Sequence, residues 1–242
     1  MNAHSDLPGQ TPSALTCRLV WQGFAQMVPV AAFVLVFGAA FGLAATQRGL
    51  GSGWSVAMSA LVFAGAAQFA ALDLWGPHMP LLALALTVFA VNARHLLMGA
   101  TLYPWLRDLP PARRYGVMVV ASDANWAQAM HAFARGERGL GLLLGGGLAL
   151  WLFWVAGTWL GTQAGGLLAD PRRWGLDMVM GCFLLAMAVG GPKSPRVLAI
   201  WAVAAGGSLL AHRWLPEHTH VVAGALAGGL AGLAWPEQTH DA

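Results

Sequence analysis

Two residues of opposite charge stand inside apolar stretches of this sequence. Arg94 lies in the run from Leu81 to Leu102, and Asp123 is the acid placed deepest in any apolar segment. At the centre of a membrane helix an arginine costs about 2.5–3.5 kcal/mol on insertion scales, so it nearly always faces a cavity or a partner charge. We expect Arg94 and Asp123 to face one cavity, where they would bind the carboxylate and the amine of a zwitterion.

Polar neighbours extend this pair. Asn92 and His95 are three residues apart, so on a helix they share a face. Asn125 follows Asp123 in the polar stretch SDAN. A carboxyl group inside a span also serves in proton relays, so Asp123 is the candidate for proton or ion coupling. The alternative is that Arg94 pairs with an acid only to pin two helices together.

A further polar residue stands in the run FAGAAQF. Gln68 is an amide in an otherwise apolar segment, and an unpaired amide in hydrocarbon costs several kcal/mol. The small residues around it, such as Gly65, leave room for a ligand or for a neighbouring helix; in the second case Gln68 only holds helices together. The candidate substrate-binding residues are therefore Gly65, Gln68, Asn92, Arg94, His95, Asp123 and Asn125.

The first apolar run contains residues that weaken helices. Pro29 removes a backbone donor, and Gly38 and Gly42 follow it in MVPVAAFVLVFGAAFGLAA. In transporters, broken helices expose backbone groups that bind substrate or ions. We expect a helix break at these three residues, against the alternative that proline and glycine are simply common in membrane helices.

Acid–base or metal chemistry is the competing interpretation of the polar residues. His95, Asp123 and His131 could in principle hold a metal or transfer protons, but no H-E-x-x-H, H-x-x-E-H or G-x-S-x-G stretch is present. His131 is more consistent with a satisfied polar contact near a segment end. We expect no catalytic residue, no metal site and no cofactor, and the sequence contains no P-loop for ATP.

Composition places the chain in a membrane. Of its 242 residues, 57% are hydrophobic and 10% are charged, where a soluble domain carries about 25% charged residues. A surface exposed to water cannot be built from so few charges, whereas a surface exposed to lipid needs almost none. The 31 glycines allow membrane helices to approach closely.

The length of the apolar segments supports several spans, since about 18 apolar residues suffice to cross. The fourth segment contains five polar side chains, so it cannot face lipid and either lines a cavity or is re-entrant. We predict an all-α polytopic membrane protein with seven or eight transmembrane helices, some of them broken or re-entrant. The segments run over 21–46, 54–75, 78–104, 115–134, 139–163, 174–191, 196–212 and 219–235.

The charges between segments give little indication of orientation. With eight spans, seven basic residues fall on one side and five on the other, and the later loops change sides if the fourth segment does not cross. The first set is Arg48, Arg107, Arg113, Arg114, Arg172, Arg173 and Arg213, and the second is Arg18, Arg135, Arg138, Lys193 and Arg196.

The remaining composition assigns the tails and excludes nucleic acid. Residues 1–17 are polar and predict a disordered tail, 18–236 a single transmembrane domain, and 237–242 a short C-terminal tail. The net charge of +3 comes from basic residues set singly or in pairs between apolar runs, which indicates contacts with lipid headgroups and not a groove for nucleic acid. The two cysteines show no zinc-site spacing.

Four blocks together give the chain a family resemblance. FAGAAQF, NARHLLMGATL, SDANWA and WLFWVAGTWLGT occur in an order and spacing that resemble the AzlC family of branched-chain amino acid permeases, over about residues 20–235. By position, the family's small-residue and glutamine block falls on Gly65 and Gln68, its Arg-His pair on Arg94 and His95, and its acidic block on Asp123.

The resemblance implies a function and a partner. It implies an all-helical subunit, in a bacterial cytoplasmic membrane, that works with a small hydrophobic AzlD-type subunit to export branched-chain amino acids by an ion or proton gradient. Where the family commonly has an Asp-Glu pair, this chain has Asp123-Ala124, so any coupling would rest on Asp123 alone. An intramembrane enzyme and a structural or sensory subunit are the alternatives.

Overall fold

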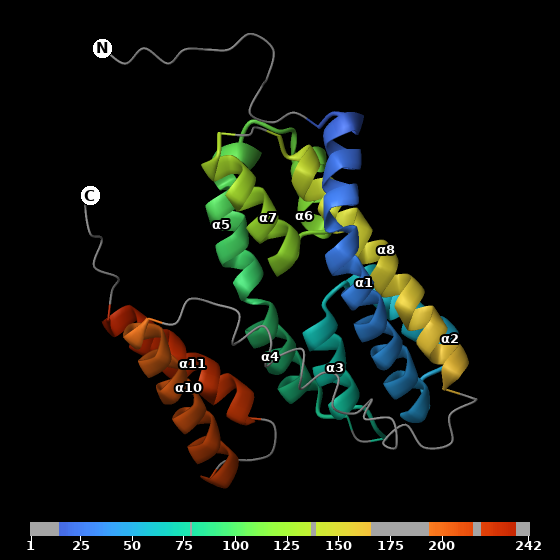
Figure 1. Cartoon of the computed structure of the whole chain (residues 1–242). Helices are drawn as coiled ribbons and strands as arrows, with labels where there is room; N and C mark the ends of the chain where they lie inside the picture. Colours follow the sequence, from blue (N-terminus) through green and yellow to red (C-terminus); the bar gives the residue numbers. More distant parts are fainter. Residues whose placement is uncertain (1–14, 78, 137–138, 166–193, 215–218, 236–242) are drawn as a thin grey trace. The chain divides into compact units, whose positions relative to one another are not determined.

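The computed structural model describes residues 15–77, 79–136, 139–165, 194–214 and 219–235 (Figure 1). All regular elements in these ranges are helices, which confirms the predicted all-α fold. The chain divides into two compact units: unit 1 contains residues 1–65 and 94–171, and unit 2 contains residues 66–93 and 172–242. Whether they form the single domain predicted for 18–236 stays a prediction, and the predicted segment 174–191 lies outside the described residues.

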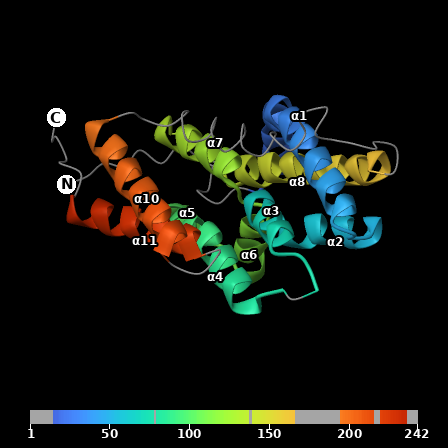
Figure 2. The same cartoon turned by 90° about the horizontal axis from the view of Figure 1, so that it is seen from below.

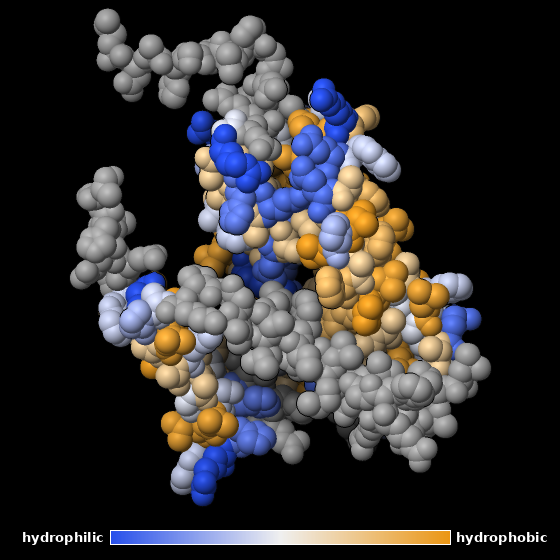
Figure 3. All heavy atoms as spheres, viewed as in Figure 1, coloured by the Kyte–Doolittle hydropathy of each residue, from blue (hydrophilic) through white to orange (hydrophobic). Residues whose placement is uncertain are grey.

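Unit 1 is built on two long apolar helices, α1 (Cys17–Gln47) and α8 (Gly141–Ala164). The two lie side by side (Figure 1, Figure 2) and run parallel, because Gly141 packs on Leu19 and Gly165 packs on Thr46. Glycines on both helices face backbone atoms of the partner helix along the contact, which is the close approach that small residues permit in membranes. In the view of Figure 3, these two helices show a largely hydrophobic face below a hydrophilic upper end.

The structure corrects the expected break in the first apolar segment. α1 continues as one helix of 31 residues through Pro29, Gly38 and Gly42. The two glycines lie at the α8 contact: a Cβ at Gly38 would meet the carbonyl oxygen of Trp154, and one at Gly42 would overlap the carbonyl oxygen of Thr158. Their role is therefore close packing and not interruption.

The short helix α2 (Ser52–Val62) packs against α8 through hydroxyl pairs. Ser52 and Thr162 approach to 2.8 Å between their hydroxyl oxygens, as do Ser59 and Thr158. Hydroxyl groups that bond across helices are common contacts in membrane interiors, where they have no water to bond. The contacts place the start of α2 beside the end of α8.

Three further helices complete unit 1: α5 (Arg94–Leu106), α6 (Pro111–Val119) and α7 (Asp123–Ala134). They share a buried apolar core with the start of α8, and the rings of Trp105 and Phe133 stack in it at 4.3 Å between centroids. The buried members of this core are Leu102, Leu106, Leu109, Val117, Ala129, Phe133, Leu140 and Leu143.

The helices α6 and α7 form a hairpin. Near the start of α6, Arg114 donates to the carbonyl oxygen of Leu106 at the end of α5, so α6 begins where α5 ends. Asp123 contacts Arg94 at the start of α5, and Phe133 stacks on Trp105 near its end, so α7 runs back in the direction of α5. Neither helix has the roughly 20 residues that a crossing needs. The fourth segment therefore enters and leaves at one end of unit 1.

Unit 2 contains α3 (Gly65–Asp73), of which all but Gly65 lies in this unit, with α4 (Leu81–Asn92), α10 (Pro195–Trp214) and α11 (Thr219–Ala234). α10 and α11 pack through small residues, with Gly224 against Ser208 and Gly228 against Ala204. Arg196, at the start of α10, donates to the carbonyl oxygens of Gly232 and Trp235 at the end of α11. α11 also packs on α4.

The described helices meet the requirements for crossing a membrane. Four stretches have the length and apolar composition for it: α1, residues 81–106 formed by α4 and α5 together, α8 and α10. The other apolar segments are shorter or interrupted. The predicted all-α membrane fold with broken helices is confirmed, although the breaks lie elsewhere than at Pro29, Gly38 and Gly42.

Candidate functional site

Three helix interruptions coincide with the sequence blocks singled out above. The segment predicted at 54–75 is interrupted at Phe63 and Ala64, just before Gly65, and the segment predicted at 78–104 at Ala93, just before Arg94. The fourth segment is interrupted at residues 120–122, just before Asp123. Gly65, Arg94 and Asp123 are therefore each the first residue of a helix, where backbone N–H groups have no partner within the helix. Asn92, in contrast, is the last residue of α4.

Arg94 and Asp123 form the ion pair that the sequence predicts. The Nη1 atom of Arg94 lies 2.5 Å from Oδ2 of Asp123, which joins the first residue of α5 to the first residue of α7. Their side chains are 37% and 34% exposed, so the pair is open on one side. The positive end of the α7 dipole adds to the attraction that holds the Asp123 carboxylate.

The guanidinium of Arg94 has binding capacity left over. A guanidinium carries five N–H donors. The Nε atom of Arg94 is buried and has no hydrogen-bond acceptor among the described residues. A buried donor without an acceptor costs about 1–3 kcal/mol, and a charged donor costs more. The site therefore favours a ligand that supplies an acceptor. A carboxylate satisfies this requirement, because it accepts two N–H bonds from one guanidinium.

Asn125 holds the turn that presents Asp123. Its side chain is fully buried, and Oδ1 accepts hydrogen bonds from the backbone N–H (2.7 Å) and the hydroxyl (2.9 Å) of Ser122. Nδ2 donates to the carbonyl oxygens of Val120 (3.1 Å) and Leu143 (2.8 Å). All hydrogen-bonding groups of the amide are thus engaged inside the protein. These bonds favour a positioning role for Asn125 over the predicted direct contact with substrate.

We expect Asn125→Ala to reduce stability by about 2–4 kcal/mol, because it removes the buried hydrogen bonds that join Asn125 to Ser122, Val120 and Leu143 and hold the turn before α7. The measurement is the thermal midpoint of the purified protein in detergent. Gln22→Ala, at an exposed position of α1, is the matched control and should leave the midpoint unchanged. Equal midpoints for Asn125→Ala and the wild type would contradict the positioning role.

An apolar cluster contacts the residue that follows Asp123. Its buried members are Met27, Ala31, Ala149 and Leu150, and Ala124, the residue after Asp123, packs against it. Phe63, at the first interruption, packs against the same cluster. Residues of the first and third sequence blocks therefore pack on one apolar cluster in unit 1.

Phe63 is a site residue that sequence reasoning missed. Its backbone is left-handed, with φ at 43° and ψ at 46°, and it ends α2. A bulky residue at positive φ is uncommon and persists only where surrounding contacts hold it. No residue pattern signals this conformation, since glycine or asparagine would be expected there.

A second pair that sequence reasoning missed joins α7 to α1. Nε2 of Gln128 donates to Oε1 of Gln26 at 3.0 Å, and Oε1 of Gln128 is buried without a partner among the described residues. The sequence could indicate that the Gln128 amide has a hydrogen-bond partner, because Gln128 lies in a polar segment. It could not identify that partner, because Gln26 lies 102 residues away along the chain. The pair ties the hairpin to the first long helix.

The other predicted site residues take different places. Gly65 packs on the ring of Trp154, where a Cβ would lie 3.1 Å from a ring atom, and Gln68 is fully buried in α3. Asn92 and His95 are partly buried on either side of the interruption at Ala93. His131 is exposed in the last turn of α7. Within the described ranges, no three residues of metal-binding type lie together.

Comparison with known proteins identifies related membrane proteins. The AzlC protein family matches residues 29–168. The inner membrane protein YgaZ of Escherichia coli is 27% identical over 66% of this chain and 66% of its own length. The branched-chain amino acid transport protein AzlC of Bacillus subtilis is 27% identical over 69% of this chain and 65% of its own length.

A third relative covers more of the chain. An uncharacterized membrane protein of Archaeoglobus fulgidus is 29% identical over 86% of this chain and 92% of its own length. The match to YgaZ and to the Bacillus protein thus spans slightly less than two thirds of each of those proteins. No solved structure matches the chain.

Proposed function

Because this chain belongs to the AzlC family and is a multi-pass membrane protein, we propose that it is the large subunit of a secondary transporter that exports branched-chain amino acids. The observation that carries the proposal is the half-open Arg94–Asp123 pair with its buried, unused Nε donor. The name of the Bacillus relative supports the substrate class. A bacterial cytoplasmic membrane is the proposed location.

The charged pair suits the two ends of a zwitterion. The substrate carboxylate would accept hydrogen bonds from the guanidinium of Arg94, including Nε. The substrate ammonium would pair with the carboxylate of Asp123. Each charge in the empty site is already neutralised by the other, so binding replaces one ion pair by two and leaves no charge unpaired. Unloading the site restores the internal pair, which keeps the empty carrier stable while it returns.

The aliphatic side chain of the substrate would lie toward the apolar cluster that Ala124 and Phe63 share. We propose that Arg94 and Asp123 contact the substrate directly. The further candidates from the sequence are Gly65, Gln68, Asn92 and His95. Asp123 is the proposed coupling group, because a carboxylate can carry a proton in place of its cationic partner. A small hydrophobic subunit of the AzlD type is the proposed partner.

The test is counterflow of radiolabelled leucine in liposomes that contain the chain with a co-expressed small subunit. We expect saturable uptake that isoleucine and valine inhibit and that alanine inhibits at least about tenfold more weakly, since each missing methylene costs about 1–3 kcal/mol in an apolar site. Absence of exchange of any hydrophobic amino acid by correctly folded protein with its partner would contradict the proposal.

Energy coupling has its own test. With an imposed proton gradient, we expect net leucine flux to follow the gradient in the wild type. In Asp123→Asn the flux should lose its response to the gradient, because an amide cannot exchange a proton. Flux in Asp123→Asn that still follows the proton gradient would exclude Asp123 as the coupling group.

A further inference from the structure

The α6–α7 hairpin determines which helix ends lie at the same end of unit 1. α6 begins and α7 ends where α5 ends, and the connection to α8 is short, so α8 begins there too. α1 runs parallel to α8 and begins at the same end. We name this the arginine end. The opposite end of unit 1 holds the end of α1, the start of α2 and the end of α8.

Basic residues concentrate at the arginine end. Four arginines there are exposed, and Arg114 donates to the carbonyl oxygens of residues 106, 107 and 109, which closes the end of α5. At the opposite end the described part of unit 1 contains Arg48 alone. Within the described part of unit 1, five arginines therefore lie at the arginine end and one at the opposite end. The four exposed arginines are Arg18, Arg107, Arg113 and Arg135.

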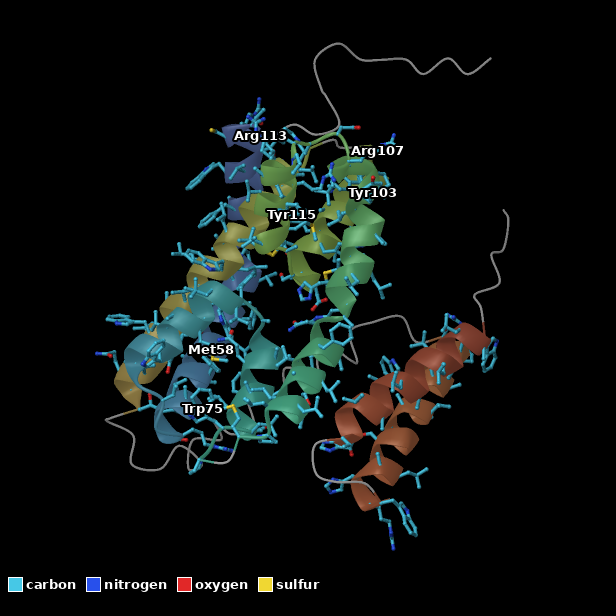
Figure 4. The ribbon with its side chains drawn as sticks, turned by 180° about the vertical axis from the view of Figure 1, so that it is seen from behind. Met58, Trp75, Tyr103, Arg107, Arg113 and Tyr115 are labelled. Carbon is cyan, nitrogen blue, oxygen red and sulfur yellow. The ribbon has the colours of Figure 1, made fainter. Side chains whose placement is uncertain are left out.

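Exposed aromatic side chains lie at the same end, near the arginines. Trp21, Tyr103 and Tyr115 are 71%, 55% and 68% exposed and lie within one or two turns of the arginines. Figure 4 shows Tyr103 with Arg107 and Tyr115 with Arg113 gathered at this end, away from Met58 on α2. Exposed tryptophan and tyrosine concentrate at the level of lipid headgroups, because their rings are partly apolar and partly polar.

We propose that the arginine end is the cytoplasmic end of unit 1 and that its exposed arginines bind the headgroups of anionic phospholipids. Basic residues near the ends of spans are in excess on the cytoplasmic side. That leaflet carries the anionic lipids whose surface potential attracts arginine. The count from the sequence was seven against five because it treated every apolar segment as a crossing. In the structure α6 begins and α7 ends at the end of α5, which places Arg135 with Arg107 and Arg113. The parallel course of α1 and α8 places Arg18 at the same end.

The proposal fixes the side from which the hairpin enters. The α6–α7 hairpin would dip into the membrane from the cytoplasm and present Asp123 at its tip to Arg94. This orientation does not depend on which molecule the site binds. It can therefore be tested without a transport assay.

A native thiol reports on the arginine end. Cys17 is free and exposed at the start of α1, and Cys182 is the only other cysteine in the sequence. In a Cys182→Ser background, we expect a membrane-impermeant maleimide to label Cys17 in inverted membrane vesicles and at least tenfold less in spheroplasts. The matched control is Gly53→Cys with both native cysteines replaced by serine, at an exposed position of the opposite end with open space around it.

The control should show the reverse pattern, with labelling in spheroplasts. Labelling of Cys17 in spheroplasts, with Gly53→Cys protected, would overturn the proposal. If both positions are labelled from the same side, α1 does not cross the membrane, and this result would overturn the proposal too.

Lipid binding is measured on the purified complex in a neutral detergent. We expect phosphatidylglycerol to raise the thermal midpoint of the wild type, while phosphatidylcholine and inorganic phosphate at the same concentration do not. A variant with Arg18, Arg107, Arg113 and Arg135 replaced by glutamine should lose at least half of that rise, whereas Arg48→Gln should keep it. Equal shifts from both lipids, or a full shift in the fourfold variant, would overturn the lipid contact; if that variant fails to fold, each single replacement is compared with Arg48→Gln.

Discussion

Replacing Arg94 by glutamine is expected to reduce leucine counterflow by about 100-fold or more while the protein still folds. The variant removes the only cation seen beside Asp123 in the described residues and leaves the substrate carboxylate without a guanidinium. Loss of one partner of a desolvated, hydrogen-bonded charge pair costs about 2–5 kcal/mol, which corresponds to roughly 30-fold to several thousand-fold. Arg94→Lys should recover only part of the activity, because an ammonium lacks the planar pair of donors.

The control for this prediction is Arg213→Gln, an exposed position at the end of α10, which should transport at the wild-type rate. Folding is checked by size-exclusion chromatography and by the thermal midpoint. Wild-type counterflow in a folded Arg94→Gln protein would remove Arg94 from the site.

A double replacement separates substrate binding from helix pinning. In Arg94→Gln with Asp123→Asn, no charge is left unpaired and an amide pair can still join α5 to α7. If the ion pair only pinned the two helices, the double variant would transport better than either single variant. If both residues hold the substrate, as we propose, the double variant folds better than the single ones and transports no better.

Replacing Gly42 by alanine is expected to lower stability by about 3 kcal/mol or more. A Cβ there would overlap the carbonyl oxygen of Thr158 on α8, and this atom belongs to the backbone of a packed helix that cannot turn away. Separation of α1 and α8 would disturb a contact that extends over most of both helices. The thermal midpoint in detergent and the yield of monodisperse protein measure the effect.

Gly116→Ala is the matched control for Gly42→Ala. Gly116 lies inside α6 with open space where a Cβ would stand, so alanine should raise the stability there by up to about 1 kcal/mol. The sign of the Gly42 result also distinguishes two roles: at a flexible break alanine would strengthen the helix, and at a tight contact it weakens the fold. An unchanged or raised midpoint for Gly42→Ala would show that the contact with Thr158 is not tight.

The sequence predicted the charged pair because membranes make such residues costly. Arg94 and Asp123 stood out by their position in apolar stretches, and in a helical fold each had few possible partners. The same reasoning gave most of the apolar helices, since length and composition alone decide whether a segment can cross. It also recognised that the polar fourth segment is not an ordinary span, although it left two possibilities open.

Local residue types were a poor guide to where helices break. Pro29, Gly38 and Gly42 look like breaking residues, but α8 supports α1 along its length, and the two glycines are needed for that contact. The interruption at Phe63 has no signal of its own, because packing against the cluster of Met27, Ala31, Ala149 and Leu150 holds a conformation that phenylalanine rarely adopts. Tertiary contacts therefore overrode local propensity in both directions.

The role of Asn125 and the sides of the loops needed the tertiary structure. Asn125 has the same polar character as a ligand-binding amide, and only its bonds to Ser122, Val120 and Leu143 favour a positioning role. The direction of the hairpin follows from contacts of Arg114 and Asp123 with opposite ends of α5. The sequence by itself determined which residues are too polar for lipid, because that is a property of each side chain. Which of them meet, and on which side the arginines gather, depends on contacts between residues far apart in the chain, and only the folded structure supplies those.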